Sequence, residues 1–257
     1  MKSFFSALAF LTVVPVPRGL ACGGKNSMFY SFPVVGLLIG AVTAAVLICA
    51  NAAFGGIVSA ALAVAAGFIL TGALHLDGLA DCADAFYGRR SREDVLRILK
   101  DPRIGTMGGL AIGLSLLMRF ACLASLAARP ALIVIPLACA FSRTSVVFCV
   151  QTLPYARAGG GILGGTGGEG PPSRSAPLLA TAGVAAAAIA ALVPVCALAA
   201  AAALAVFWPL ARRKTGGYTG DVLGASIEIA EIVFLLAAVG AEKMGIGPGL
   251  LRLMTGR

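Results

Sequence analysis

The sequence predicts an all-α fold: a polytopic bundle of about seven transmembrane helices that forms one domain over residues 1–257. Hydrophobic residues make up 59% of the chain and charged residues only 12%, whereas about a quarter of the residues in a soluble domain are charged. Residues 26–76 contain no Asp, Glu, Lys or Arg, although crossing a bilayer takes only about 20 apolar residues. Short polar or proline-containing breaks divide this and similar runs into segments of helix length.

The expected spans follow from those breaks. They cover residues 32–50, 57–76, 107–128 and 131–151, two alanine-rich segments of 175–211 on either side of Pro194, and residues 224–241. The small residues of the alanine-rich pair suit close packing of helices in lipid. Residues 4–14 are apolar too, but they end at Pro15 and no small-residue cleavage site follows. They therefore predict an interfacial helix rather than a signal peptide.

Basic residues predict how the bundle is oriented. The long polar connections at residues 77–106, 152–174 and 212–223 alternate with very short ones, so they lie at one membrane face. Together with the N-terminal segment, that face holds 14 of the 20 Lys and Arg residues, and such an excess is typical of the cytoplasmic side. This topology explains the net charge of +9. Because the basic loops lack interleaved aromatic residues, we expect no nucleic-acid partner.

The segment 74–84 carries three carboxylates at the polar end of the second expected span. At 100° per residue, Asp77, Asp81 and Asp84 share one stripe of a helix. Carboxylates stacked in this way repel one another unless a cation lies among them, and Mg²⁺ prefers oxygen ligands. We therefore interpret the stripe as a Mg²⁺ site, with a solvated helix end as the alternative. His75, the only histidine, falls on the opposite side of such a helix; it is a weaker candidate ligand, and an interfacial or substrate-contacting role is equally open.

A helix-start signal opens the third span. Asp101 is the expected N-cap and Pro102 the first helical residue. Gly105 and the glycines that follow leave backbone N–H groups open to a ligand, while Lys100 and Arg103 add positive charge. These features predict an anion site, and a close-packed helix entry is the alternative.

Two arginines lie inside expected spans, where a charged side chain is costly and a functional role is the first hypothesis. Arg143, with Arg157 at the end of the same span, is expected to hold phosphate oxygens. Arg119 has the same possible role, but snorkelling to the interface or pairing with an acid explains it as well.

The last span contains a second acidic stripe. Asp221, Glu228 and Glu231 fall within about 80° of one another on a helix, and Asp221 comes two residues after Thr219. Acids one or two turns inside a span are expensive unless they are paired or bound to metal, so this stripe also predicts function.

Five motifs occur along the chain in one order. They are residues 10–17 (FLTVVPVP), 75–84 (HLDGLADCAD), 99–105 (LKDPRIG), 154–157 (PYAR) and 217–221 (GYTGD). Together they resemble the cobalamin synthase family, the adenosylcobinamide-GDP ribazoletransferases, and the resemblance covers nearly the whole chain.

The resemblance implies a multi-pass enzyme of the bacterial inner membrane whose active site faces the cytoplasm. Its substrates would be adenosylcobinamide-GDP and α-ribazole or α-ribazole 5′-phosphate, its products GMP and adenosylcobalamin or its 5′-phosphate, and its cofactor Mg²⁺. The expected site residues are the catalytic pair Asp81 and Asp84; the metal ligands Asp77, Asp81, Asp84 and Asp221; the substrate or phosphate contacts Lys100, Asp101, Arg103, Gly105, Arg143, Arg157 and Thr219; and the further candidates His75, Glu228 and Glu231.

Two other functions stay open at this point. Residues 77–80 (DGLA) also resemble the start of the CDP-alcohol phosphotransferase signature, although Asp81 stands where that family has an arginine. An ion-coupled transporter would use Glu228, Glu231 and the intramembrane arginines, and it predicts a broken helix near mid-bilayer. The sequence does not determine whether the chain forms a homo-oligomer.

Overall fold

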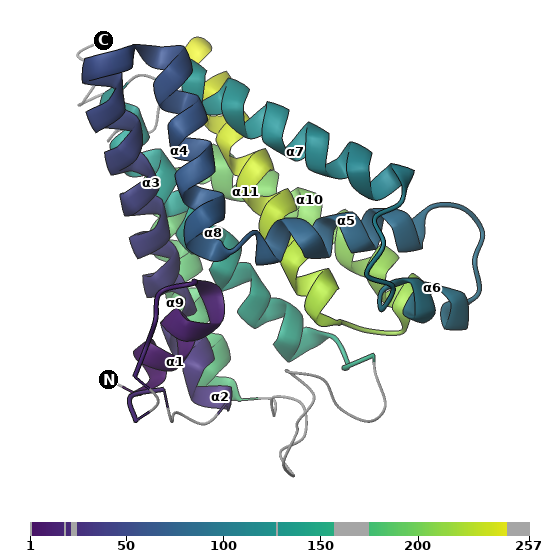
Figure 1. Cartoon of the computed structure of the whole chain (residues 1–257). Helices are drawn as coiled ribbons and strands as arrows, with labels where there is room; N and C mark the ends of the chain where they lie inside the picture. The colour runs from purple at the N-terminus through teal and green to yellow at the C-terminus, as the bar shows by residue number, and fades with distance from the viewer. Residues whose placement is uncertain (1, 18, 22–24, 127, 157–174, 246–257) are drawn as a thin grey trace.

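A computed structural model describes residues 2–17, 19–21, 25–126, 128–156 and 175–245. All regular secondary structure in that part of the chain is helical, which confirms the predicted class (Figure 1). The helices are α1 (Lys2–Leu11), α2 (Lys25–Met28), the 3₁₀ helix η1 (Phe29–Ser31), α3 (Phe32–Phe54), α4 (Gly56–Thr71), α5 (Leu74–Phe86), α6 (Arg92–Ile98), α7 (Thr106–Ser125), α8 (Ala128–Thr152), α9 (Ala176–Leu192), α10 (Pro194–Thr215) and α11 (Gly220–Lys243).

The count of membrane spans is lower than expected. Among the described residues, five helices are long and apolar enough to cross a bilayer: α3 with η1, α7, α8, α10 and α11. The bent pair of α4 and α5 makes a sixth if it is counted as one span. The prediction of about seven was therefore too high by one or two, because α4 has only 16 residues and α9 only 17.

The expected span 57–76 is wrong at its polar end. Helix α4 stops at Thr71, and α5 leaves it at an angle of 89°. Gly72 (φ 61°) and Ala73 (φ 56°) both adopt the left-handed conformation at the bend. Glycine does so at little cost, but alanine rarely does. As a result, α5 runs across the bundle instead of along it (Figure 1).

The described parts of the polar connections meet at one end of the molecule, as the sequence predicts. Arg92 Nε donates to Thr215 O at 2.8 Å, and Lys214 Nζ donates to Gly88 O at 2.7 Å. These bonds join the segment around α6 to the connection between α10 and α11. The turn between α3 and α4 lies at the opposite end (Figure 1).

Helices α3 and α8 approach each other very closely. A Cβ added to Gly36 would lie 2.5 Å from Cys139 O, and one added to Gly40 would lie 2.5 Å from Pro136 Cα. Small residues four positions apart let helix backbones pack together in lipid. This contact fixes α8, which carries Arg143, against the first span.

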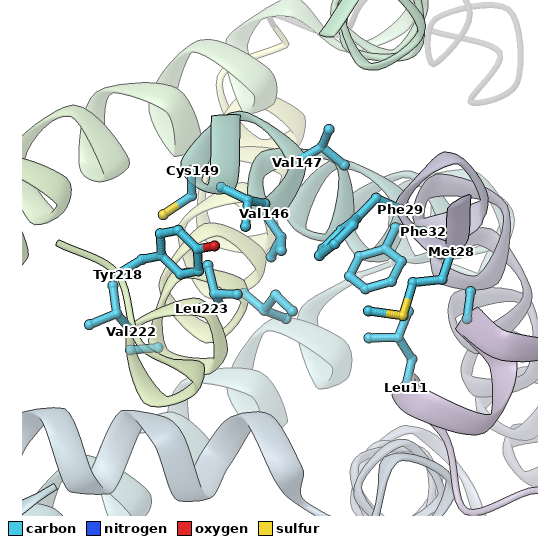
Figure 2. Close-up of a cluster of buried hydrophobic side chains, with 14 of the residues drawn as sticks. Leu11, Met28, Phe29, Phe32, Val146, Val147, Cys149, Tyr218, Val222 and Leu223 are labelled. Carbon is cyan, nitrogen blue, oxygen red and sulfur yellow. The ribbon is translucent and has the colours of Figure 1, made fainter. Parts of the chain in front are cut away.

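The core at the polar end joins the N-terminal segment to the last helix. Leu11, Phe29 and Phe32 are buried together with side chains of α8 and α11 (Figure 2). The outer surface is apolar as well: Val206 is 74% exposed and Ile57 71%. Lipid-facing residues of this kind are expected where the bilayer is the solvent.

Candidate active site

Helix α5 carries the acidic stripe, and the stripe is helical as predicted. Asp77 is exposed, and Asp81 and Asp84 are half-buried. His75, on the opposite side of the helix, is only 4% exposed. Asp77 and, in part, Asp81 are therefore accessible from outside, Asp84 is partly covered, and the histidine points into the protein.

Helix α5 crosses the beginning of α11 at two glycines. A Cβ added to Gly78 would lie 2.8 Å from Asp221 O, and one added to Gly224 would lie 3.2 Å from His75 O. This close crossing brings Asp221, far away in the sequence, against the acid-bearing helix. Of the second predicted acidic stripe, Asp221 is thus the member whose backbone packs against α5.

The anion predicted at the start of α7 is supplied by the protein itself. Asp84 Oδ2 accepts a hydrogen bond from Gly105 N at 2.7 Å, and its Oδ1 accepts one from Gly108 N at 2.9 Å. A carboxylate here satisfies two N–H groups that a helix start otherwise leaves without partners. A Cβ on Gly105 would lie 2.5 Å from Asp84 Oδ1, so glycine is needed for this close approach.

The expected helix start at Asp101 and Pro102 is wrong. The N-cap of α7 is Gly105, because the Asp101 carboxylate turns to its own neighbour. Asp101 Oδ2 lies 2.7 Å from Arg103 Nη2, and Oδ1 accepts from Arg103 Nε at 2.9 Å. These hydrogen bonds lower the pKa of Asp101 to about 2. Arg103 and the neighbouring Lys100 are both exposed.

The intramembrane charges form one buried cluster. Arg119 Nη2 lies 2.8 Å from Glu228 Oε2, and the same guanidinium binds Glu231. Arg143 binds the other oxygen of Glu231. Ser115 Oγ adds a hydrogen bond to Glu228 at 3.0 Å. Two arginines thus balance two glutamates, so pairing with an acid was the correct alternative for Arg119.

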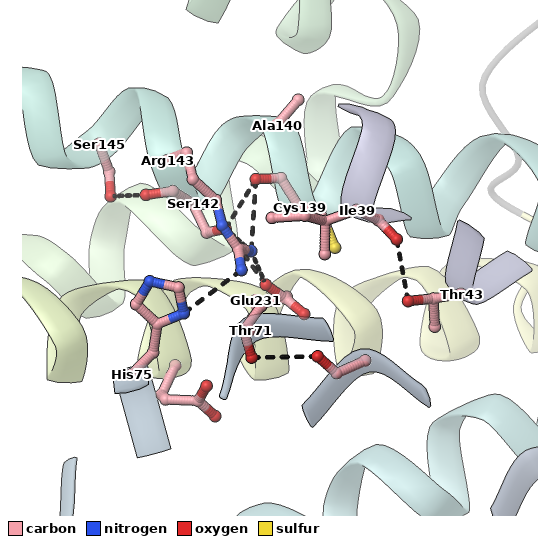
Figure 3. A network of polar contacts seen from close by, with 12 residues as sticks. Ile39, Thr43, Thr71, His75, Cys139, Ala140, Ser142, Arg143, Ser145 and Glu231 are labelled. Atoms are coloured by element: carbon pink, nitrogen blue, oxygen red, sulfur yellow. Dashed lines mark hydrogen bonds and ion pairs between the residues drawn. The ribbon is translucent and has the colours of Figure 1, made fainter. Parts of the chain in front are cut away.

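Further contacts tie this cluster to the neighbouring helices. Arg143 Nη1 donates to Ser142 Oγ at 3.0 Å, and Arg143 Nη2 lies 3.4 Å from His75 Nδ1 (Figure 3). Arg119 stacks over the ring of Phe68 in α4 at 5.4 Å. The cluster therefore links α4, α5, α7, α8 and α11. None of its charged side chains is more than 10% exposed.

Thr219 caps α11 rather than facing solvent. Its Oγ1 accepts from Val222 N at 3.2 Å and donates to Asp221 Oδ2 at 3.2 Å. Thr219 is fully buried. Tyr218 beside it is also buried, and this burial raises the pKa of its hydroxyl. The motif 217–221 therefore sets the position of Asp221.

No group of three or more His, Cys, Asp or Glu side chains within the described residues is arranged to hold a metal ion. Mg²⁺, however, commonly takes only one or two carboxylates and fills its other positions with water and substrate phosphates. Asp77 and Asp81, one helical turn apart on the open side of α5, suit that mode of binding. The donor set thus fits a magnesium ion that arrives with its substrate.

Sequence reasoning found the charged residues but missed how they are connected. Ser115 and Ser142 were overlooked, and nothing in their local sequence distinguishes them. The equal number of arginines and glutamates inside apolar spans was a usable signal, since unpaired charges are costly there. Arg157 lies outside the described residues.

The fold and the site define a helical membrane protein with an acidic helix at its polar end and a charge-balanced cluster inside. The chain belongs to the cobalamin-5-phosphate synthase family, whose model matches residues 3–239. A relative from Chlorobaculum parvum, named adenosylcobinamide-GDP ribazoletransferase, is 40% identical over 93% of this chain and 96% of its own length. A relative of the same name from Escherichia coli is 37% identical over 92% of this chain and 98% of its own. No solved structure gives a significant match.

Proposed function

We propose that this protein is an adenosylcobinamide-GDP ribazoletransferase, which joins α-ribazole or its 5′-phosphate to adenosylcobinamide-GDP and releases GMP. One observation carries the proposal: the family match spans nearly the whole chain, including the acid-bearing helix α5 and the start of α11 that packs on it. The reaction is a substitution at phosphorus. A ribazole hydroxyl attacks the phosphorus that bears the cobinamide group, the bond to the bridging diphosphate oxygen breaks, GMP leaves and the hydroxyl proton is released.

Such a transfer needs positive charge around the diphosphate and a fixed position for the two reactants. We assign Mg²⁺ to Asp77 and Asp81, and Asp221 is a further candidate because its backbone packs against Gly78 of the same helix. When bound, the ion would screen the phosphate charges and stabilise the leaving group. Of these acids, Asp81 lies at the centre of the stripe and is the strongest candidate for a role in catalysis.

The contacts of Asp84 support a role different from the catalytic and metal-binding role that the sequence predicts. Both of its oxygens accept backbone N–H groups of α7, so we propose that it orients α5 against α7. For the phosphates we propose Lys100 and Arg103, which are exposed next to this junction. Arg143 is left out, because Glu231 and His75 engage its buried guanidinium.

We place the site on the cytoplasmic side of a bacterial inner membrane. The support is the clustering of basic connections at the end of the molecule where α5 and α6 lie.

One observation favours the transporter alternative, and another opposes it. The bend between α4 and α5 is a broken helix of the kind that transporters use. The acids that would carry an ion, Glu228 and Glu231, are instead neutralised by Arg119 and Arg143. Together with the family match, this pairing favours the transferase.

The test is turnover of purified protein in lipid with adenosylcobinamide-GDP and α-ribazole 5′-phosphate, with Mg²⁺ or with a chelator. We expect GMP and the corrinoid product to form together, and only with Mg²⁺. Asp81→Asn should lose most of this turnover, whereas Glu93→Gln, an exposed acid on α6, should retain it. Equal turnover with the chelator would refute the magnesium site. No product from folded protein would refute the transferase and make CDP-alcohol phosphotransfer the next assay.

A further inference from the structure

The only histidine of the chain lies at the junction between the buried charge cluster and the acidic helix. His75 is in the first turn of α5, directly after the bend at Gly72 and Ala73. Its Nδ1 lies 3.4 Å from Arg143 Nη2 (Figure 3). Arg143 is held in turn by Glu231 of α11. A chain of polar contacts thus runs from α11 through α8 to the helix that carries the aspartates.

The donor and acceptor roles in this contact follow from the chemistry of the two groups. A guanidinium only donates hydrogen bonds. His75 Nδ1 must therefore accept, and the ring proton of the neutral histidine sits on Nε2. Within the described residues, Nε2 is buried and has no hydrogen-bond partner. The polar contact of the imidazole that the structure shows is thus the one through Nδ1.

Backbone hydrogen bonds such as the one from Ala73 N to Phe68 O at 2.9 Å lead into α5, but no side chain caps it. Its N-cap is Ala73, whose side chain makes no capping hydrogen bond. The aspartate stripe begins at Asp77, only two residues after His75. A shift of the first turn would therefore move the acids relative to the start of α7 and to Asp221.

We infer that His75 is a positioning residue for the transfer reaction: through Nδ1 it transmits the position of Arg143 to α5 and so fixes where Asp77 and Asp81 lie. The inference rests on the proposed transferase function. It assigns no contact with substrate to His75 itself. It also gives the buried cluster a purpose beyond holding helices together.

Two substitutions separate the two ring nitrogens. His75→Asn keeps an acceptor oxygen near the position of Nδ1, whereas His75→Gln carries its oxygen near the position of Nε2. We expect Asn to retain kcat within about threefold and Gln to lower it roughly 10- to 100-fold, since a misplacement of about 1 Å can cost about 100-fold. The KM for adenosylcobinamide-GDP should change much less than kcat in both. The reverse order, with Gln active and Asn inactive, would overturn the inference, and so would equal kcat in both folded variants.

Hydrogen–deuterium exchange gives a readout that does not require activity. In lipid nanodiscs, backbone amides of residues 74–80 should exchange faster in His75→Gln than in wild type, and at the wild-type rate in His75→Asn. Arg143→Lys, which keeps the charge beside Glu231 but removes the Nη2 donor, should also loosen residues 74–80 and covers the case in which Gln fails to fold. Unchanged exchange in the folded Gln or Lys variant would overturn the positioning role. If the wild-type protein lacks transferase activity but the variants show the expected differences in exchange, only the proposed function is refuted.

Discussion

Two groups of carboxylates in this protein face opposite conditions. Glu228 and Glu231, inside the bundle, are bound by two arginines and are less than 10% exposed. Asp77 and Asp81, on α5, lie on the open side of the helix at the polar end. The first group is neutralised within the protein, whereas the second is placed where a cation from outside can reach it.

The difference shows where function is expected in a membrane enzyme of this kind. In an apolar medium a charge is tolerated only with its counter-charge, so Glu228 and Glu231 are bound to arginines and are not available to a ligand. At the membrane surface, water can solvate an ionised carboxylate, so an acid there is accessible to a cation from outside. The bend between α4 and α5 is what moves one set of acids out of the span and into that position.

The largest expected effect comes from a substitution that breaks the buried charge cluster. Glu231→Gln removes the charge that Arg119 and Arg143 share. Breaking a buried pair by removing one partner costs about 3–5 kcal/mol, so we expect a strongly lowered Tm in detergent or nanodiscs, or loss of folded protein. Glu242→Gln, near the end of the same helix, is the matched control and should keep the wild-type Tm. A Glu231→Gln protein as stable as wild type would show that the cluster does not hold the bundle together.

The two groups also differ in how far the sequence predicted them. Helical periodicity placed Asp77, Asp81 and Asp84 on one stripe, because neighbours on a helix depend on local geometry alone. The bend was missed, since Ala73 adopts a left-handed conformation that its residue type disfavours. The pairing of Arg119 and Arg143 with acids of α11 depends on helix packing, which the sequence supplies only as a charge balance.

The start of α7 illustrates the same limit at the open site. The glycines and the preference for an anion were predicted from residues 99–109, but the anion is Asp84. A contact between two helices cannot be deduced from either segment by itself.

The next largest effect is expected for a substitution at the contact between Asp84 and the start of α7. A Cβ on Gly108 would overlap the Asp84 carboxylate and lie 3.1 Å from Ala80 O. Forcing extra atoms into a tight contact costs about 1–3 kcal/mol, so we expect Gly108→Ala to lower the Tm and turnover together. Gly109→Ala is the control, because no atom lies within 4 Å of its added Cβ; the better helix propensity of alanine should keep or slightly raise the Tm. Equal behaviour of the two variants would argue against the packing of α5 on α7.

A smaller effect separates Asp84 from the other acids. Asp84→Ala removes the carboxylate that accepts Gly105 N and Gly108 N, and the loss of a helix cap costs about 0.5–2 kcal/mol. We expect a moderate fall in Tm and in kcat, with the Mg²⁺ concentration for half-maximal turnover unchanged. Asp81→Asn, in contrast, should raise that concentration. If both variants raise it equally, Asp84 is a metal ligand, as the sequence alone predicted.

The smallest effect lies at the exposed pair next to the site. Arg103 lowers the pKa of Asp101 from 3.8 to about 2. A carboxyl whose pKa is lower in the folded state stabilises that state above its unfolded pKa, and the contribution disappears as the pH falls through the folded value. Any difference in Tm between wild type and Asp101→Asn should therefore be small and constant above about pH 5 and should vanish towards pH 2. Because Arg103 is 87% exposed, high salt should also reduce the difference. A difference that grows as the pH falls would mean that folding favours the protonated carboxyl and that the pair with Arg103 does not set the pKa of Asp101. A large loss of kcat with an unchanged Tm would instead place Asp101 in the substrate site.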